Sequence, residues 1–300
     1  MVVAYEPLFR EGQSLSDMAF EPLRIDANHE GWREFKILID FYKRGDHRKP
    51  NKTGVFSPKF GLKSKLSGDK LLEFARANGD ADVCIVNAFP SIPYWSLNVW
   101  MQGEGVHPGL TERAQRLLDV VGIEWDLSKI GRQKQNVVCY SNFWLGSPAF
   151  WEAYVGKVLL PIAQFLERHP SHEVAQAVLE ETDHTERAPF LPFIIERLFS
   201  TFLSFNPDIK VVSYPLGPDA ALEYCLTDFE RDIVAYMRPL VDAADEYHMP
   251  AELARLMGLL SKIHQRYILA QFAHQPNPHS GKPYNATLEV AVDDLRDDRT

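Results

Sequence analysis

Cysteine is scarce in this sequence of 300 residues, with Cys84, Cys139 and Cys225 as the whole complement and no C-x-x-C pair among them. An odd number of widely spaced cysteines does not form a disulfide framework or the usual zinc and redox motifs. Cys84 and Cys139 lie inside apolar runs, where a free cysteine commonly packs as a small hydrophobic side chain. This usage of cysteine indicates a cytosolic protein.

Long apolar runs are also missing. The N-terminal residues MVVAYEPLFREG lack the basic segment and the apolar stretch of a signal peptide. The longest apolar runs elsewhere are too short, and too often interrupted, to span a bilayer. We therefore expect a cytoplasmic protein without a transmembrane segment, which would reach the inner face of the membrane only through partners or a surface patch.

Positive charge is the third deficit, because 32 Lys and Arg residues stand against 41 Asp and Glu, a formal net charge of −9. Binding to nucleic acid needs a basic surface that displaces counterions, so we expect no nucleic-acid partner. The composition, 45% hydrophobic and 24% charged, is that of a folded globular protein.

The common catalytic signatures are absent as well. The sequence contains no GxxxxGK[ST], GxGxxG, GxSxG or HExxH motif. P-loop nucleotidases, dinucleotide oxidoreductases, α/β-hydrolases and the commonest zinc proteases are therefore poor first hypotheses.

What the sequence does contain is an alternation of predicted strands and helices. Short β-branched runs predict strands over residues 2–8, 54–57, 82–89, 136–141 and 210–214. Apolar periodicity predicts helices between them, over residues 32–42, 68–78, 108–121, 148–169 with a break at Pro161, 171–181 and 192–203. This order is typical of an α/β fold with a mostly parallel sheet flanked by helices.

The last third has a different character. We expect one α/β domain over residues 1–217, a helical extension over 218–273 with a break at 248–250, and a linker or loose tail over 274–300. A linker at that position suggests a native chain with further domains.

Polar residues at strand ends are the first candidates for a site, because open α/β sheets bind ligands there. The segment 54–65 carries Ser57, Lys59, Lys63 and Lys65 after a predicted strand. Lysines so placed in an acidic protein would neutralise a diphosphate. The alternative is a solvated loop.

Asn87 ends the apolar run DVCIVNAF and opens a loop rich in aromatic and polar residues: Tyr94, Trp95, Asn98, Trp100, Gln102, Glu104 and His107. Aromatic rings beside amides and a carboxylate commonly line sugar pockets, since sugars have apolar faces ringed by hydroxyls. For either tryptophan alone, packing in the core is the stronger interpretation. Asn142 is a further candidate, at the end of the strand predicted over 136–141.

Glu196 and Arg197 lie on the narrow polar strip of an otherwise apolar helix. A carboxylate in the first turns of a buried helix is a candidate general base, and partial burial would raise its pKa towards neutrality. The alternative is an ion pair on a solvated face. The acidic run Glu180, Glu181, Asp183, His184 and Glu186 is a candidate metal cluster, but such runs are more often exposed loops.

Several segments together resemble a known family. The segments are GWREFKILIDFYK, TGVFSPKF, DVCIVNAFP, YSNFWLGSPAFWEAY and PFIIERLFSTFL. From Val2 to Tyr214 the chain resembles bacterial GT-A-type glycosyltransferases of capsule and O-antigen biosynthesis, and is most similar to the capsular galactofuranosyltransferase-like families. The resemblance implies a nucleotide-sugar donor and a carbohydrate or lipid-linked glycan acceptor.

The resemblance also implies roles for residues. A carboxylate at the start of a late helix commonly serves as the base in this family, and Glu196 matches it by position. The expected donor contacts are Ser57, Lys59, Lys63 and Asn87. The expected sugar and acceptor contacts are Trp100, Gln102, Glu104, His107, Asn142 and Arg197.

The sequence departs from the family at the metal site. GT-A enzymes usually carry an Asp-x-Asp motif after a central strand, where it holds a divalent metal. Here the only nearby triplet, Asp80-Ala-Asp82, precedes the strand. We therefore expect no cofactor and neutralisation of the diphosphate by lysines, with a metal site of different construction as the alternative. A non-catalytic carbohydrate-binding or assembly module of a larger glycan-synthesis protein also fits this departure, and so does a different transferase acting on polysaccharide.

Overall fold

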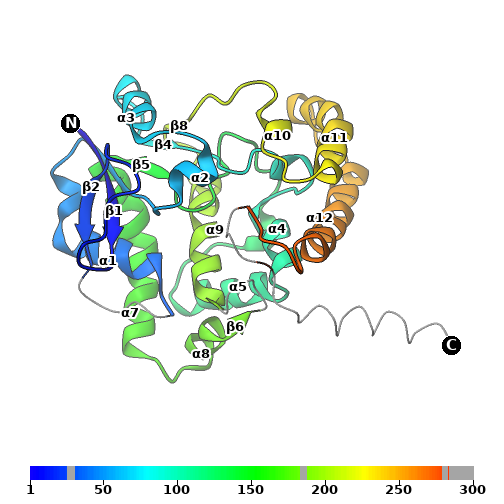
Figure 1. Ribbon diagram of the computed structural model, residues 1–300. Helices are drawn as coiled ribbons and strands as arrows, with labels where there is room; N and C mark the ends of the chain where they lie inside the picture. Colours follow the sequence, from blue (N-terminus) through cyan, green and yellow to red (C-terminus); the bar gives the residue numbers. More distant parts are fainter. Residues whose placement is uncertain (26–30, 183–187, 279–282, 284–300) are drawn as a thin grey trace.

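The computed structural model describes residues 1–25, 31–182, 188–278 and 283. Its main sheet has six strands in the order β2-β1-β3-β5-β4-β8. Their bounds are β1 Val2–Leu8, β2 Glu21–Arg24, β3 Lys52–Val55, β4 Val83–Ile85, β5 Trp144–Gly146 and β8 Val211–Ser213. Helices cover the sheet (Figure 1), so the predicted α/β class is confirmed.

Five of the six strands run in one direction. β1 is parallel to β2 and β3, and β4 is parallel to β8. β5 lies between β3 and β4 and is antiparallel to both. The sheet is therefore mostly parallel, with one reversed strand at its centre. β2 is not among the strands predicted from the sequence.

The strand predicted over residues 136–141 is wrong. That segment consists of turns and irregular backbone, and β5 begins only at Trp144. Ser141 and Asn142 have φ angles of 62° and 53°, which are left-handed and cannot continue a strand. Cys139 and Tyr140 are nevertheless buried. The apolar residues of 136–141 therefore indicated that the segment is buried, but not that its backbone is extended.

The predicted helices of the α/β part are present with small shifts of their ends: α1 Glu34–Arg44, α3 Gly68–Ala77, α5 Leu110–Val120, α8 Glu173–Leu179 and α9 Phe190–Phe205. Ser67 caps α3 by accepting a hydrogen bond from the backbone N–H of Lys70, as its residue type predicts. Shorter elements complete this part: α2 Phe60–Ser64, α4 Val99–Val106, η1 Asp46–Arg48, η2 Ile92–Tyr94, η3 Leu127–Lys129, β6 Glu181–Thr182 and β7 Ala188–Pro189.

The long helix predicted over 148–169 is present as one continuous helical stretch over 148–168 with three parts. It consists of α6 Pro148–Trp151, the π-helical segment η4 Glu152–Leu159 and α7 Leu160–Arg168. Pro161 lies in the first turn of α7, where a missing N–H costs no helical hydrogen bond. The backbone nevertheless stays helical across Pro161, so the chain is not broken there, and only the hydrogen-bonding pattern changes, from π to α at Leu160.

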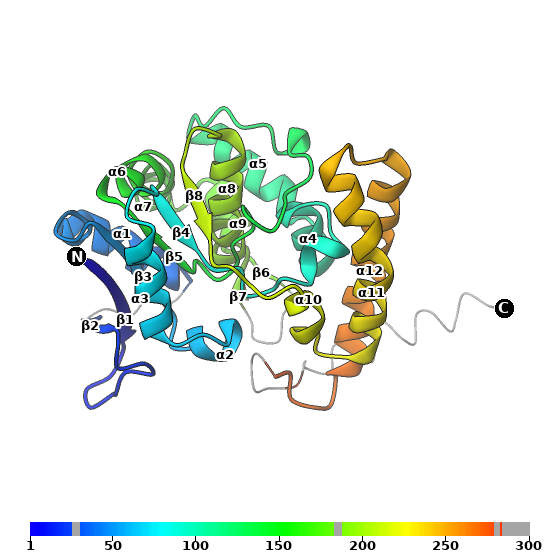
Figure 2. The ribbon, with the colours of Figure 1, turned by 90° about the horizontal axis from the view of Figure 1, so that it is seen from above.

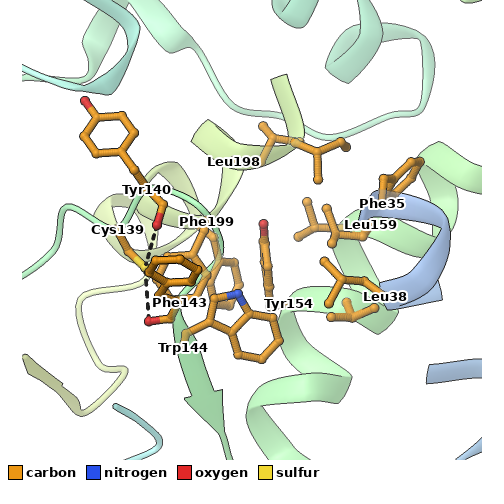
Figure 3. Packing of buried hydrophobic residues seen from close by; sticks show 14 of the residues in the cluster. Phe35, Leu38, Cys139, Tyr140, Phe143, Trp144, Tyr154, Leu159, Leu198 and Phe199 are labelled. Carbon is orange, nitrogen blue, oxygen red and sulfur yellow. Dashed lines mark hydrogen bonds between the residues drawn. The ribbon is translucent and has the colours of Figure 1, made fainter. Parts of the chain in front are cut away.

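The main core lies between the sheet and the helices that cover it. Figure 3 shows side chains of α1, β5, η4 and α9 packed together, with Trp144 against Tyr154 and Phe199. The rings of Trp144 and Phe199 are stacked with centroids 5.6 Å apart. Tyr140 lies at the border of this cluster, and its hydroxyl points away from the apolar side chains (Figure 3).

Three helices form the C-terminal part: α10 Ala220–Glu223, α11 Asp228–Glu246 and α12 Ala251–Gln271. Figures 1 and 2 show α11 and α12 side by side, on the opposite side of the molecule from β1 and β2. They pack on a second apolar cluster that includes Trp95, Val234, Met237 and Met257. The predicted break before Ala251 is confirmed. No helix within the described residues is long and apolar enough to cross a bilayer.

Candidate functional site

A cavity of about 610 Å³ opens at the edge of the sheet where the parallel strands end. Its wall includes Phe9 after β1, Ser57 and Lys59 after β3, and Phe89 after β4. Loops that leave the carboxyl ends of parallel strands meet at one edge, which is why ligands of open α/β sheets bind there. The volume is in the usual range of small-molecule sites.

The reversed strand β5 brings a further loop to the same edge. Because β5 is antiparallel to β3 and β4, its amino end lies at their carboxyl ends. Ser141 and Asn142 precede β5 and line the cavity. Asn142 is thus at the predicted edge, but it precedes its strand where the sequence interpretation had it follow one.

Glu196 projects from the second turn of α9 onto the cavity wall. Its Oε1 accepts a hydrogen bond of 2.5 Å from the backbone N–H of Ser141. Its Oε2 lies 3.7 Å from Nη1 of Arg197, and 23% of its side chain is exposed. One carboxylate oxygen is therefore held in place, while the other is outside hydrogen-bonding distance of that guanidinium.

Lys63 approaches the same loop from the other side. Its Nζ donates a 2.9 Å hydrogen bond to Oγ of Ser141. Burial lowers the pKa of Lys63, and the nearby carboxylate of Glu196 acts in the opposite direction. Ser141 thus contacts a carboxylate through its backbone and an ammonium through its hydroxyl. Ser57 and Lys59 line the wall nearby, and the Ser57 hydroxyl accepts the backbone N–H of Lys59.

Arg197 is buried, at 3% exposed, and its donors are engaged. Nε donates to the carbonyl of Val99, Nη1 to the carbonyl of Phe193, and Nη2 to Oε1 of Gln102 at 2.6 Å. Burial lowers its pKa, which Glu196 and Tyr140 counteract. Arg197 and Gln102 line the cavity, and their mutual contact joins α9 to α4.

His107 is also on the wall and is held by its neighbours. Its Nδ1 lies 2.6 Å from the hydroxyl of Thr182, and its ring stacks on Phe193 with centroids 3.9 Å apart. The cavity therefore gathers eight residues expected from the sequence: Ser57, Lys59, Lys63, Gln102, His107, Asn142, Glu196 and Arg197.

Three expected site residues lie elsewhere. Asn87 is 2% exposed. Its Nδ2 donates a hydrogen bond to Oε1 of Gln135, and its Oδ1 accepts one from the backbone N–H of Phe89, so the side chain shapes the loop after β4. Trp100 is in the core and donates from Nε1 to the hydroxyl of Thr201. Glu104 accepts the N–H groups of Gly109 and Thr111 and so supports the start of α5.

The wall includes residues that the sequence interpretation did not propose: Arg33, Glu34, Tyr140, Ser141, Glu230, His264 and Asn277. The hydroxyl of Tyr140 has no hydrogen-bond partner within the described part of the chain, and burial raises its pKa. Asn277 belongs to the predicted tail, yet it is 5% exposed. For Glu230 the sequence did contain a signal, because Thr227 and Glu230 have the spacing of a capping box at the start of a helix.

The candidate metal cluster falls mostly outside the described residues, which exclude Asp183, His184 and Glu186. Glu180 forms an ion pair of 2.8 Å with Arg113. Asp82, of the Asp80-Ala-Asp82 triplet, accepts the backbone N–H of Lys210 before the start of β4. That end of β4 is opposite to the cavity. Within the described ranges no three His, Cys, Asp or Glu side chains are grouped as metal ligands would be.

Chemically, the cavity combines a partly exposed carboxylate, a partly buried ammonium, a second lysine and several polar groups between apolar walls. Such an arrangement can accept a proton from a hydroxyl and stabilise a negatively charged group nearby. Comparison of the chain with family models, with curated proteins and with solved structures found no match.

Proposed function

We propose that this protein is a glycosyltransferase, which moves a sugar from a nucleotide-sugar donor to a carbohydrate acceptor in bacterial surface polysaccharide synthesis. The observation that supports this most is the placement of Glu196 on the wall of the same cavity as Lys59 and Lys63. The resemblance of residues 2–214 to the GT-A-type enzymes supplies the type of reaction.

In this proposal Glu196 is the general base. It takes the proton of the acceptor hydroxyl as the oxygen bonds to the anomeric carbon, and the bond from that carbon to the diphosphate breaks. The hydrogen bond of 2.5 Å from Ser141 N–H orients the carboxylate without using both of its oxygens. A single displacement of this kind inverts the anomeric configuration.

The lysines support the leaving group. Lys59 follows β3 at the cavity edge, and Lys63 is partly buried beside Ser141. Ammonium groups that are already in position stabilise the negative charge that develops on a departing diphosphate. The proposal therefore gives these cations the role that a divalent metal has in most GT-A enzymes.

The substitution Glu196→Gln tests the proposal because it keeps the shape of the side chain and removes the base. We expect transfer to slow by about 100-fold or more. Donor binding, measured as thermal stabilisation by a panel of nucleotide sugars with and without Mn²⁺ or Mg²⁺, should change little.

Glu173→Gln is the matched control, because Glu173 is an exposed carboxylate on α8 that pairs with Arg116. It should leave transfer unchanged. Transfer that continues at the normal rate in Glu196→Gln would remove Glu196 from catalysis. An absence of stabilisation by any nucleotide sugar would instead favour the non-catalytic carbohydrate-binding module.

A further inference from the structure

A buried acid–imidazole pair lies on the cavity wall that α11 and α12 form. Nε2 of His264 is 2.6 Å from Oε1 of Glu230, and the two side chains are only 8% and 7% exposed. Both residues line the cavity. Neither has a part in the transfer mechanism built on Glu196, and the pair comes from the C-terminal helices and not from the sheet.

The local sequence holds Glu230 in place. Thr227 caps α11 by accepting the backbone N–H of Glu230 at 3.1 Å. In return, Oε2 of Glu230 accepts the backbone N–H groups of Thr227 and Leu226. This reciprocal capping box leaves Oε1 for His264. The carboxylate is therefore anchored by the backbone on one side and by the imidazole on the other.

The hydrogen bonds determine which ring nitrogen carries a proton. An ionised carboxylate only accepts hydrogen bonds, so Nε2 of His264 must be the donor to Oε1. In the neutral ring Nδ1 then has a free lone pair, and Nδ1 has no hydrogen-bond partner among the residues that the structure describes. Trp95 stacks on the ring with centroids 4.0 Å apart, which restrains its orientation.

The charges of the wall are divided between its two sides. The cations are Arg33, Lys59, Lys63 and Arg197, and all belong to the α/β part. Beyond residue 217 the described wall has no Lys or Arg; apart from Glu230 and His264 it consists of Tyr224, Leu226, Gln265, Ile268, Leu269 and Asn277. A diphosphate is favoured on the first side, and a neutral polar ligand on the second.

We propose that the wall formed by α11 and α12 binds the carbohydrate acceptor, and that Nδ1 of His264 accepts a hydrogen bond from one of its hydroxyls. This inference rests on the proposed function for the identity of the ligand. Glu230 is then a positioning residue, which fixes the tautomer and direction of the imidazole through Nε2. The C-terminal helices thus supply the acceptor side of the cavity.

The first test observes His264 in the unmodified full chain. The ¹⁵N signal of Nδ1 should shift when methyl glycosides of common hexoses and pentoses are added. A shift caused by inorganic phosphate or by nucleoside diphosphates, without one from any methyl glycoside, would overturn the proposal.

The second test uses His264→Gln, whose amide nitrogen can still donate to Glu230 while no acceptor remains in place of Nδ1. We expect KM for the acceptor to rise roughly 3- to 10-fold, the usual effect of one uncharged hydrogen bond. KM for the donor should stay the same. The control Lys262→Gln changes an exposed residue of α12 that is not on the wall.

The outcomes also separate this inference from the proposed function. An unchanged KM for the acceptor in His264→Gln, with transfer still dependent on Glu196, would refute the acceptor site and leave the transferase intact. A His264 signal that responds to methyl glycosides while Glu196→Gln has no effect would retain the carbohydrate site and refute the catalytic role of Glu196.

Discussion

Ser141 and Asn142 are two consecutive residues with positive φ, and neither is glycine. Such a backbone costs about 1–3 kcal/mol per residue and persists only where the surroundings enforce it. Here it turns the N–H of Ser141 towards Glu196 and its hydroxyl towards Lys63. The strain therefore occurs where the proposed base is held, which is consistent with a site whose geometry matters more than local stability.

Glu152 shows how a single carboxylate can link distant segments. It accepts hydrogen bonds from Tyr42 at 2.5 Å and from Arg48 at 3.0 Å, and lies 3.2 Å from His47. The bonds from Tyr42, Arg48 and His47 lower the pKa of Glu152 to about 2 from an ordinary value of 4.5. Its side chain is 43% exposed, so solvent and salt screen these contacts.

A pH dependence of stability follows from this lowered pKa. The native state favours the ionised form, so its contribution is complete above about pH 4.5 and is lost as the pH falls towards 2. We expect Glu152→Gln to lower the free energy of unfolding at pH 6, with the difference from the wild type vanishing near pH 2. Urea unfolding across this range measures it, and a difference independent of pH would contradict the assignment.

At the scale of elements, the close approach of α4 to α9 positions the site. A Cβ atom added at Gly103 of α4 would lie 2.6 Å from Cδ2 of Leu110 and would also clash with Nε of Arg197. Since Arg197 donates to Val99 of the same helix, the absent side chain lets the guanidinium reach the backbone of α4.

We therefore expect Gly103→Ala to destabilise the fold by about 1–3 kcal/mol through overpacking. The control is Gly105→Ala in the same helix, where the nearest atom would be Oγ of Ser261 at 3.4 Å. That change should be neutral or should stabilise the protein by up to about 1 kcal/mol, because alanine favours helix. Chemical denaturation measures both variants, and equal effects would show that the contact with Arg197 is unimportant.

The antiparallel direction of β5 is the second feature at this scale that positions the site. A strand running in the common direction would carry Ser141 and Asn142 to the far edge of the sheet. Antiparallel pairing with β3 and β4 brings them to the edge where Lys59 and Glu196 lie. One strand direction thus determines whether the carboxylate has its backbone donor.

At the scale of the molecule, the cavity depends on the attachment of the C-terminal helices. Arg132 forms a two-pronged ion pair with Asp245 of α11, with both N–O distances 3.0 Å. It also donates to the carbonyl of Pro93 at 2.6 Å. The two side chains are 9% and 19% exposed, so the pair is largely shielded from water.

Asp245→Ala should therefore lower the free energy of unfolding by roughly 1.5–3 kcal/mol, since it leaves the guanidinium without its charged partner. Asp232→Ala changes an exposed residue of the same helix and should alter stability by no more than about 0.5 kcal/mol. Thermal unfolding of both variants provides the comparison. Two similar midpoints would mean that this ion pair does not hold the C-terminal helices.

The sequence alone determines that this protein is an α/β protein, and most of its helices and strands lie where local patterns predict them. The helix cap at Ser67 depends only on neighbouring residues. The placement of Ser57 and Lys59 at the cavity edge also follows from the sequence, because both come directly after a parallel strand. These are consequences of short-range chemistry.

The tertiary structure alone decided the remainder. Asn87, Trp100 and Glu104 have side chains suited to a sugar site, yet contacts with distant residues or a local capping role occupy their polar atoms. Conversely, Ser141, Glu230 and His264 line the cavity because of a strand direction and a helix docking that pair residues far apart in the chain. Local sequence patterns cannot predict such pairings, since the paired residues contact each other and stabilise the protein only once the chain is folded.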